Sequence, residues 1–235
     1  MSDLAITVEQ GIGTVRFDRP AKRNALTGDM MVRLGAAIPA VMDQGARVVL
    51  VTGGPDMFTA GADLSEFTNS EADLEVEERL AAAADALAAA PVPTIAAIEG
   101  PCLGAGVELA LACDVRVAGR GAFFMIPATK FGILYRPEGV TRIERALGYQ
   151  TAARLFLLNE RLHAEDAWAA DVVGVLTDTG EAYRVAHGLA VHAASLHSGS
   201  VEATKRLMRE IHTGEPSGED WDEVRRNLAR GPRNA

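Results

Sequence analysis

A glutamate placed shortly after a glycine-rich turn carries the clearest chemical potential in this sequence. The turn Gly104-Ala105-Gly106 opens a short apolar helix, and Glu108 follows Ala105 by one helical turn on the same face. Backbone N–H groups at a helix start have no intrahelical acceptor and lie at the positive end of the helix dipole. They suit a phosphate or a thioester enolate. An acid beside them fits proton transfer next to a carbonyl. A surface carboxylate on an ordinary buried helix is the alternative hypothesis.

The elements that must position this turn alternate between strands and helices. The apolar run 94–98 precedes the turn and a second apolar strand, 114–118, follows its helix. Outside them we expect a hairpin over 4–17 turning at 11–13, a helix 27–44 kinked by Pro39, a strand 47–52, an alanine-rich helix from Ser70 to Pro91, a strand 122–126, helices 141–147, 151–159 and 163–172, and a strand 173–176. The last third reads as helical only, over 181–196, 200–212 and 219–229. The pattern predicts an α/β fold with an all-helical C-terminal region.

Composition narrows the class of protein. The 235 residues contain 48% hydrophobic side chains, enough for a sizeable core. A net charge of −9 and a pI near 5.1 argue against nucleic-acid binding. Cys102 and Cys113 stand in apolar surroundings, and we interpret them as reduced core residues. No targeting segment and no apolar run of ~18 residues is evident, so we expect a cytoplasmic protein without membrane insertion.

Other sites of known chemistry do not fit the sequence. The turn supplies the G-x-G of a dinucleotide fingerprint, but Leu109 stands at the third position, and no acid follows about twenty residues later. Walker, serine-elbow and zinc-ligand patterns are also missing, and the five histidines are scattered. We therefore expect neither a nicotinamide cofactor nor a metal.

Two glycine-flanked turns, 59–64 (TAGADL) and 103–108 (LGAGVE), have similar sequences. Together with Arg19-Pro20, 24–26 (NAL) and the segment 147–167, they resemble the crotonase (enoyl-CoA hydratase/isomerase) superfamily, from the first hairpin to about Leu176. The resemblance implies a spiral of ββα units over residues 1–178. It also implies a helical region over 179–235 that drives assembly into trimers or dimers of trimers. Coenzyme A would be part of the substrate, with no separate cofactor.

The resemblance also assigns site residues by position. The backbone N–H groups of Ala62 and Ala105 would form an oxyanion hole, and Glu108 would be an acid/base. The candidates for binding substrate and coenzyme A are Lys22, Arg23, Ala25, Ala60, Asp63, Leu64 and Gly104. Asp63 has a second interpretation as a helix-capping carboxylate, and Lys22 and Arg23 as a solvated basic loop.

The acids depart from the family pattern. Hydratases of the superfamily carry two glutamates, and the second position is Ala128 here. Tyr135 falls where methylmalonyl-CoA decarboxylases of the superfamily place a tyrosine. Glu138 either replaces the missing acid or serves as a helix-start carboxylate. Three hypotheses follow: an enzyme with hydratase/isomerase-type chemistry, a malonyl-type decarboxylase using Glu108 and Tyr135, and a non-catalytic fatty-acyl-CoA binding protein.

Overall fold

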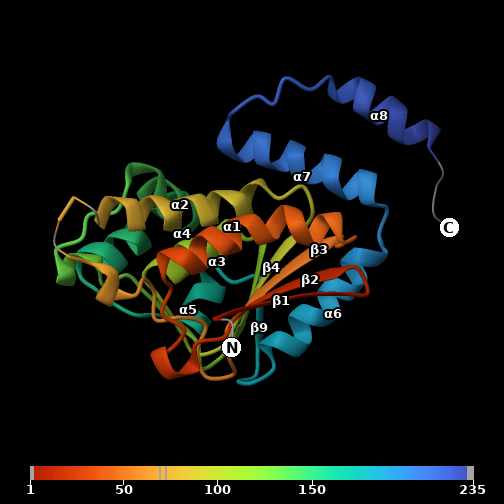
Figure 1. Cartoon of the computed structure of the whole chain (residues 1–235). Coiled ribbons are helices and arrows are strands. Elements are labelled where there is room, and N and C mark those ends of the chain that lie inside the picture. The colour runs from red at the N-terminus through yellow and green to blue at the C-terminus, as the bar shows by residue number, and fades with distance from the viewer. Residues whose placement is uncertain (1–2, 69, 72, 232–235) are drawn as a thin grey trace.

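A six-stranded sheet forms the centre of the computed structural model, which describes residues 3–68, 70–71 and 73–231 (Figure 1). Its strand order is β1-β2-β3-β4-β6-β9, with bounds Leu4–Glu9, Ile12–Phe17, Val48–Thr52, Thr94–Ile98, Val115–Gly119 and Val175–Thr177. The β1–β2 hairpin is antiparallel, and every later pairing in this sheet is parallel. All five residues of β3 are buried, as its continuous apolar run predicted.

A smaller sheet of three strands lies beside the first, with order β5-β7-β8 and bounds Pro101–Leu103, Phe123–Met125 and Leu162–His163. Twice along the chain, one strand joins the large sheet, the next joins the small sheet, and a helix follows. The units are β4-β5-α3 and β6-β7-α4. This repeat is the expected spiral of ββα units.

Helices cover both faces of the large sheet. Their bounds are α1 Gly28–Asp43, α2 Asp73–Ala89, α3 Ala105–Ala112, α4 Pro137–Leu157, α5 Ala164–Ala169 and α6 Ala182–Ser195. Val48 and Leu50 of β3 face the four buried alanines of α6, whereas Val49 and Val51 face the main core below α1, α2 and α3. This alternation follows from the two-residue period of a strand. Figure 1 shows α1 and α6 on opposite sides of the sheet.

Several predicted boundaries were wrong for physical reasons. β5 and β8 are too short to give a periodic signal. The helix expected from His163 begins at Ala164 because Leu162–His163 pairs with β7. The helices expected at 141–147 and 151–159 form one run from Pro137, since proline suits a first helical turn, and Gly148 interrupts it with non-helical dihedrals (φ 71°, ψ 155°). In α1 the helix continues past Pro39 to Asp43.

The last two helices, α7 (Ser198–Thr213) and α8 (Trp221–Arg230), extend beyond the sheet layers in Figure 1. Lys205 of α7 ties this region to the core, because its Nζ lies 2.7 Å from Asp114 Oδ2 and donates to Val92 O. Met208 and Ile211 of α7 remain 65% and 74% exposed. Assembly into trimers or hexamers stays a prediction. No helix of the described residues combines the length and the apolar composition needed to cross a membrane.

Candidate active site

The two glycine-flanked turns are in direct backbone contact. The Leu103 N–H donates to Thr59 O at 3.0 Å. Gly61 has a positive φ of 88°, and a Cβ on it would lie 2.8 Å from Leu103 O. Only glycine allows the first turn to approach the second this closely. Two segments more than forty residues apart in sequence therefore share one wall of a pocket.

Ala62 and Ala105 each bring a free backbone donor to this wall. On either side of Ala62, Gly61 O accepts from Leu26 N and Asp63 N donates to Leu26 O, both at 2.8 Å. Ala105 is the first residue of α3 and follows Gly104, whose φ is 54°. Among the described residues, neither N–H has an acceptor. Both residues line the same pocket, so two backbone donors without an acceptor in the described chain border one cavity.

The pocket between the turns has a volume of about 100 Å³ and an apolar lining. Its two candidate anion donors, Ala62 and Ala105, meet Glu108 on the same surface. The other lining residues are Ala60, Gly61, Leu64, Phe67, Glu77, Leu80, Ala81, Gly104, Pro127, Ala128, Phe131, Ile133, Tyr135 and Arg136. An apolar lining with a few polar groups is typical of a small-molecule site.

Glu108 is a buried carboxylate that lines this pocket. It is 8% exposed, and its Oε1 accepts a hydrogen bond from Arg142 Nη1 at 2.9 Å. Burial raises the pKa of Glu108, Arg142 opposes that rise, and Asp85 adds to it. The pKa of Glu108 is thus higher than that of an ordinary glutamate. This placement favours the acid/base hypothesis over a surface carboxylate.

Tyr135 brings a neutral hydroxyl to the same pocket. A Cβ on Gly104 would lie 3.6 Å from its Oη, and its ring packs edge-on against Phe156 with centroids 5.3 Å apart. Burial, and then the charge of Glu108, raise the pKa of Tyr135 well above its usual value. Its phenol therefore stays protonated and can donate a hydrogen bond beside the turn at Gly104.

Glu138 does not line the pocket. Its side chain is 65% exposed, and its Oε2 lies 3.5 Å from Arg136 Nε. It is the second residue of α4, after Pro137, where a carboxylate interacts favourably with the helix dipole. The side chain points to solvent, so the geometry gives no support for Glu138 as a replacement acid. Ala128 does line the pocket and is buried, so the second family position holds no acid.

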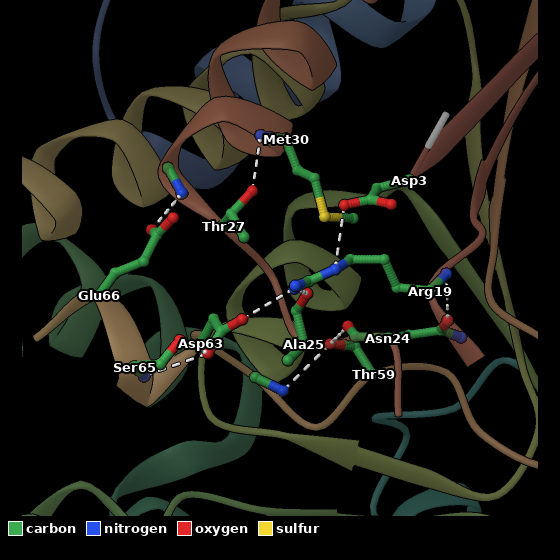
Figure 2. A network of polar contacts seen from close by, with 12 residues as sticks. Asp3, Arg19, Asn24, Ala25, Thr27, Met30, Thr59, Asp63, Ser65 and Glu66 are labelled. Carbon is green, nitrogen blue, oxygen red and sulfur yellow. Dashed lines mark hydrogen bonds and ion pairs between the residues drawn. The ribbon is translucent and has the colours of Figure 1, made fainter. Parts of the chain in front are cut away.

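Asp63 is committed to an internal network, shown in Figure 2. Its Oδ1 accepts from the backbone N–H and hydroxyl of Ser65, and its Oδ2 lies 2.8 Å from Arg19 Nη1. Arg19 also pairs with Asp3 and donates to Ala25 O. The hydrogen bond from Ser65, then that from Arg19, lowers the pKa of Asp63 to about 2. Asp63 is outside the pocket lining and caps the turn after Ala62, which was its second interpretation.

This network makes a prediction about stability. Asp63→Asn removes the charge that pairs with Arg19, and we expect it to lower the free energy of unfolding by about 1–3 kcal/mol at pH 7. Because the folded pKa lies below the ordinary 3.8, the stabilisation is complete above about pH 4 and is lost as pH falls towards 2. Urea unfolding at pH 7 and pH 3 should show the difference between parent and variant shrinking. Asp18→Asn, in an exposed pair with Arg16, should change little at either pH.

The other positions predicted to contact coenzyme A divide between the pocket lining and the loop 22–25. Ala60, Leu64 and Gly104 line it. Lys22 and Arg23 are exposed and do not, but their loop is adjacent, because Ala60 N–H donates to Arg23 O at 3.0 Å. Ala25 is half-buried and holds Arg19 through its carbonyl.

The two arginines near Glu108 were not predicted from the sequence. Arg142 contacts it directly, and Arg136 lines the pocket. No spacing rule marks either residue. Asp85, the partner of Arg142, was visible as the charge interrupting the apolar run 81–90. In the described part of the chain, no three His, Cys, Asp or Glu side chains cluster as metal ligands.

The chain is similar in sequence to proteins of known family. The family model of enoyl-CoA hydratase/isomerase matches residues 7–218. A protein of Mycobacterium tuberculosis named a probable enoyl-CoA hydratase, echA6, is 32% identical over 88% of this chain and 82% of its own length. The 2,3-dehydroadipyl-CoA hydratase of Escherichia coli is 32% identical over 89% and 83%.

Solved structures agree with the sequence comparison. An enoyl-CoA hydratase/carnithine racemase from Magnetospirillum magneticum superposes with a TM-score of 0.89 at 28% identity. The match covers 97% of this chain and 88% of that one. The fold is therefore the crotonase fold, and the chain belongs to the enoyl-CoA hydratase/isomerase family.

Proposed function

We propose that this protein is an acyl-CoA enzyme that forms a thioester enolate, with Ala62 and Ala105 as anion donors and Glu108 as the acid/base. One observation carries the proposal: a buried carboxylate lies one helical turn from a free N–H donor in the same apolar pocket. The names of the relatives, which are hydratases of CoA thioesters, support this substrate class.

The proposed roles of these residues follow from the place where negative charge develops during the reaction. When the α-carbon of a thioester loses or gains a proton, negative charge moves to the carbonyl oxygen. Two backbone N–H donors fixed by the turns stabilise that charge without reorganising, and one donor typically contributes ~10²–10³ in rate. Glu108 then exchanges a proton with the substrate or with a bound water.

We expect slow hydration, because Glu108 would have to perform the work that two glutamates share in the family's hydratases. Addition of water needs one group to orient and deprotonate the water and another to protonate carbon, each typically contributing ~10²–10⁴-fold. With Ala128 at the second position, we expect crotonyl-CoA hydration to run at least ~10²-fold below a two-glutamate hydratase. Loss of the absorbance of the conjugated thioester measures the rate. A full hydratase rate that also survives Glu138→Ala would contradict this expectation.

Decarboxylation of a malonyl-type CoA is the second candidate, favoured by Tyr135. Cleavage of the bond between the α-carbon and the carboxylate releases CO₂ and leaves the same enolate. Its α-carbon then takes a proton from Glu108. A phenol that stays protonated beside Gly104 can donate a hydrogen bond to the substrate during this step. This reaction needs only one carboxyl side chain as the proton donor, so the alanine at position 128 does not prevent it.

A panel of CoA thioesters separates these functions. Crotonyl-, malonyl- and methylmalonyl-CoA are incubated with the protein and analysed by mass spectrometry. Gain of 18 mass units identifies hydration, and loss of 44 identifies decarboxylation. Saturable binding of all three without any conversion would favour the third hypothesis, a non-catalytic acyl-CoA binding protein, and would overturn the proposal of an enzyme.

A further inference from the structure

Three helices meet at the Glu108 carboxylate. Arg142 of α4 places Nη1 2.9 Å from Glu108 Oε1 on α3, and its Nη2 donates to Asp85 Oδ1 on α2. Glu108 and Arg142 have side chains only 11% and 20% exposed, whereas Asp85 is 60% exposed. The guanidinium therefore bridges a buried carboxylate and one at the surface.

The backbone of α4 also packs against the Glu108 carboxylate, at Gly139, one helical turn before Arg142. A Cβ on Gly139 would lie 3.1 Å from both Oε1 and Oε2 of Glu108. Gly139 and Arg142 are three residues apart, so they share a face of α4. The missing side chain at Gly139 lets this face come close enough for the arginine to reach Glu108.

The two oxygens of Glu108 are consequently unequal. Oε1 is held by Arg142, while Oε2 has no hydrogen-bond partner among the described residues and belongs to a side chain that lines the pocket. Because a guanidinium is planar with fixed donor directions, binding Asp85 by one nitrogen also sets the direction of the other. An arginine paired in this way restricts the carboxylate more tightly than a lysine would.

We propose that Arg142, held by Asp85, is a positioning residue that fixes Glu108 through Oε1. Oε2 is then the atom that transfers the proton. This inference rests on the proposed function. Both partners act through Glu108 and neither lines the pocket. In this arrangement a single oriented carboxylate, Glu108, performs the proton transfer although position 128 holds alanine.

The charges around Glu108 make the proposal testable by pH. Facing it are Asp85 on α2, Tyr135 in the loop before α4, Arg136 at the N-terminus of α4 and Arg142 on α4, while Glu77 of α2 lines the same pocket. Arg142 and Arg136 lower the pKa of Glu108, and Asp85 raises it. Removing Arg142 should therefore raise this pKa, and removing the charge of Asp85 should lower it.

The first arm of the test is a titration that needs no turnover. Protein labelled with ¹³C at the glutamate carboxyl is titrated by NMR, with Glu108→Gln identifying the Glu108 signal. We expect Arg142→Met to move its midpoint up by ~1 pH unit and Asp85→Asn to move it down. Arg145→Met, an exposed arginine one turn along α4, is the matched control and should leave it unchanged.

The second arm measures rates on crotonyl-, malonyl- and methylmalonyl-CoA across pH. We expect Arg142→Met to lower kcat about 10- to 100-fold with KM within a few-fold. Arg142→Lys keeps the positive charge but loses the planar guanidinium that binds Glu108 and Asp85 together. It should therefore keep the titration midpoint of Glu108 near that of the parent and still lower kcat.

The two arms fail separately. If no thioester is converted, the proposed function is wrong, while the titration still decides whether Arg142 and Asp85 control Glu108. If Arg142→Met titrates and turns over like Arg145→Met, the inference is overturned. If Arg142→Met does not fold, Arg142→Lys and Asp85→Asn give the same decision.

Discussion

Replacing Glu108 with glutamine is expected to lower turnover of a CoA thioester by at least ~10²-fold, while acyl-CoA affinity stays within a few-fold of the parent. Glutamine keeps the volume and an oxygen that can accept the hydrogen bond from Arg142 Nη1. It cannot exchange a proton. The loss should therefore fall on kcat and leave substrate binding nearly intact.

Glu77 offers a matched control, because it is the other carboxylate that lines the pocket. Burial, and then the charge of Asp73, raise the pKa of Glu77, so its pKa is shifted in the same direction as that of Glu108. It does not share the place of Glu108 one turn after Ala105. Glu77→Gln should change turnover by no more than a few-fold. If Glu108→Gln only lowers the melting temperature and spares turnover, Glu108 is structural and the chemistry belongs to other groups.

The large elements of the fold were predictable from sequence because they repeat a signal over many residues. β3 is a continuous apolar run, and its burial on both faces followed from that run alone. Thr27 caps α1 by accepting from Met30 N–H at 3.2 Å, as the position of a threonine before an apolar helix indicated. Such cues are local, so no knowledge of the partner elements was needed.

The short elements depended on partners distant in sequence. β8 has two residues, and its strand geometry exists because Phe123 and Phe124 pair with it. The sequence predicts Gly13 in the hairpin turn, but the turn lies at Gln10–Gly11. Gly13 is in β2, where a Cβ would lie 2.8 Å from Val41 Cγ2. Its requirement for glycine is set by packing against α1, and no local pattern reveals that.

In the candidate site, too, residues with a local sequence signal were predictable and residues placed by distant packing were not. The two glycine-flanked turns and Glu108 were recognisable by type and spacing, and the structure brings all three to one pocket. The direction of the Glu138 side chain and the reach of Arg142 to Glu108 depend on how α4 packs against α3. Residues that act through such packing carry no motif of their own.

Ala105→Pro is expected to lower kcat/KM by ~10²–10³-fold, because it deletes one oxyanion-hole donor and leaves the other. Ala105 is the first residue of α3, where proline is well tolerated since its missing N–H would have no intrahelical acceptor. The residue before a proline must avoid the α-helical region, and Gly104 does so with φ 54° and ψ −122°. The helix should therefore form normally.

Ala105→Gly is the control for this substitution, because it changes the side chain and keeps the N–H. We expect it to retain activity within about 10-fold of the parent, allowing for the added freedom of glycine at the helix start. Circular dichroism and melting curves establish that both variants are folded, and kcat/KM on the converted thioester then compares them. The oxyanion-hole assignment of Ala105 predicts a large gap between proline and glycine. Equal activities in two folded variants would mean that the Ala105 N–H does not touch the developing charge, and the anion would have to be stabilised from Ala62 and Tyr135 alone.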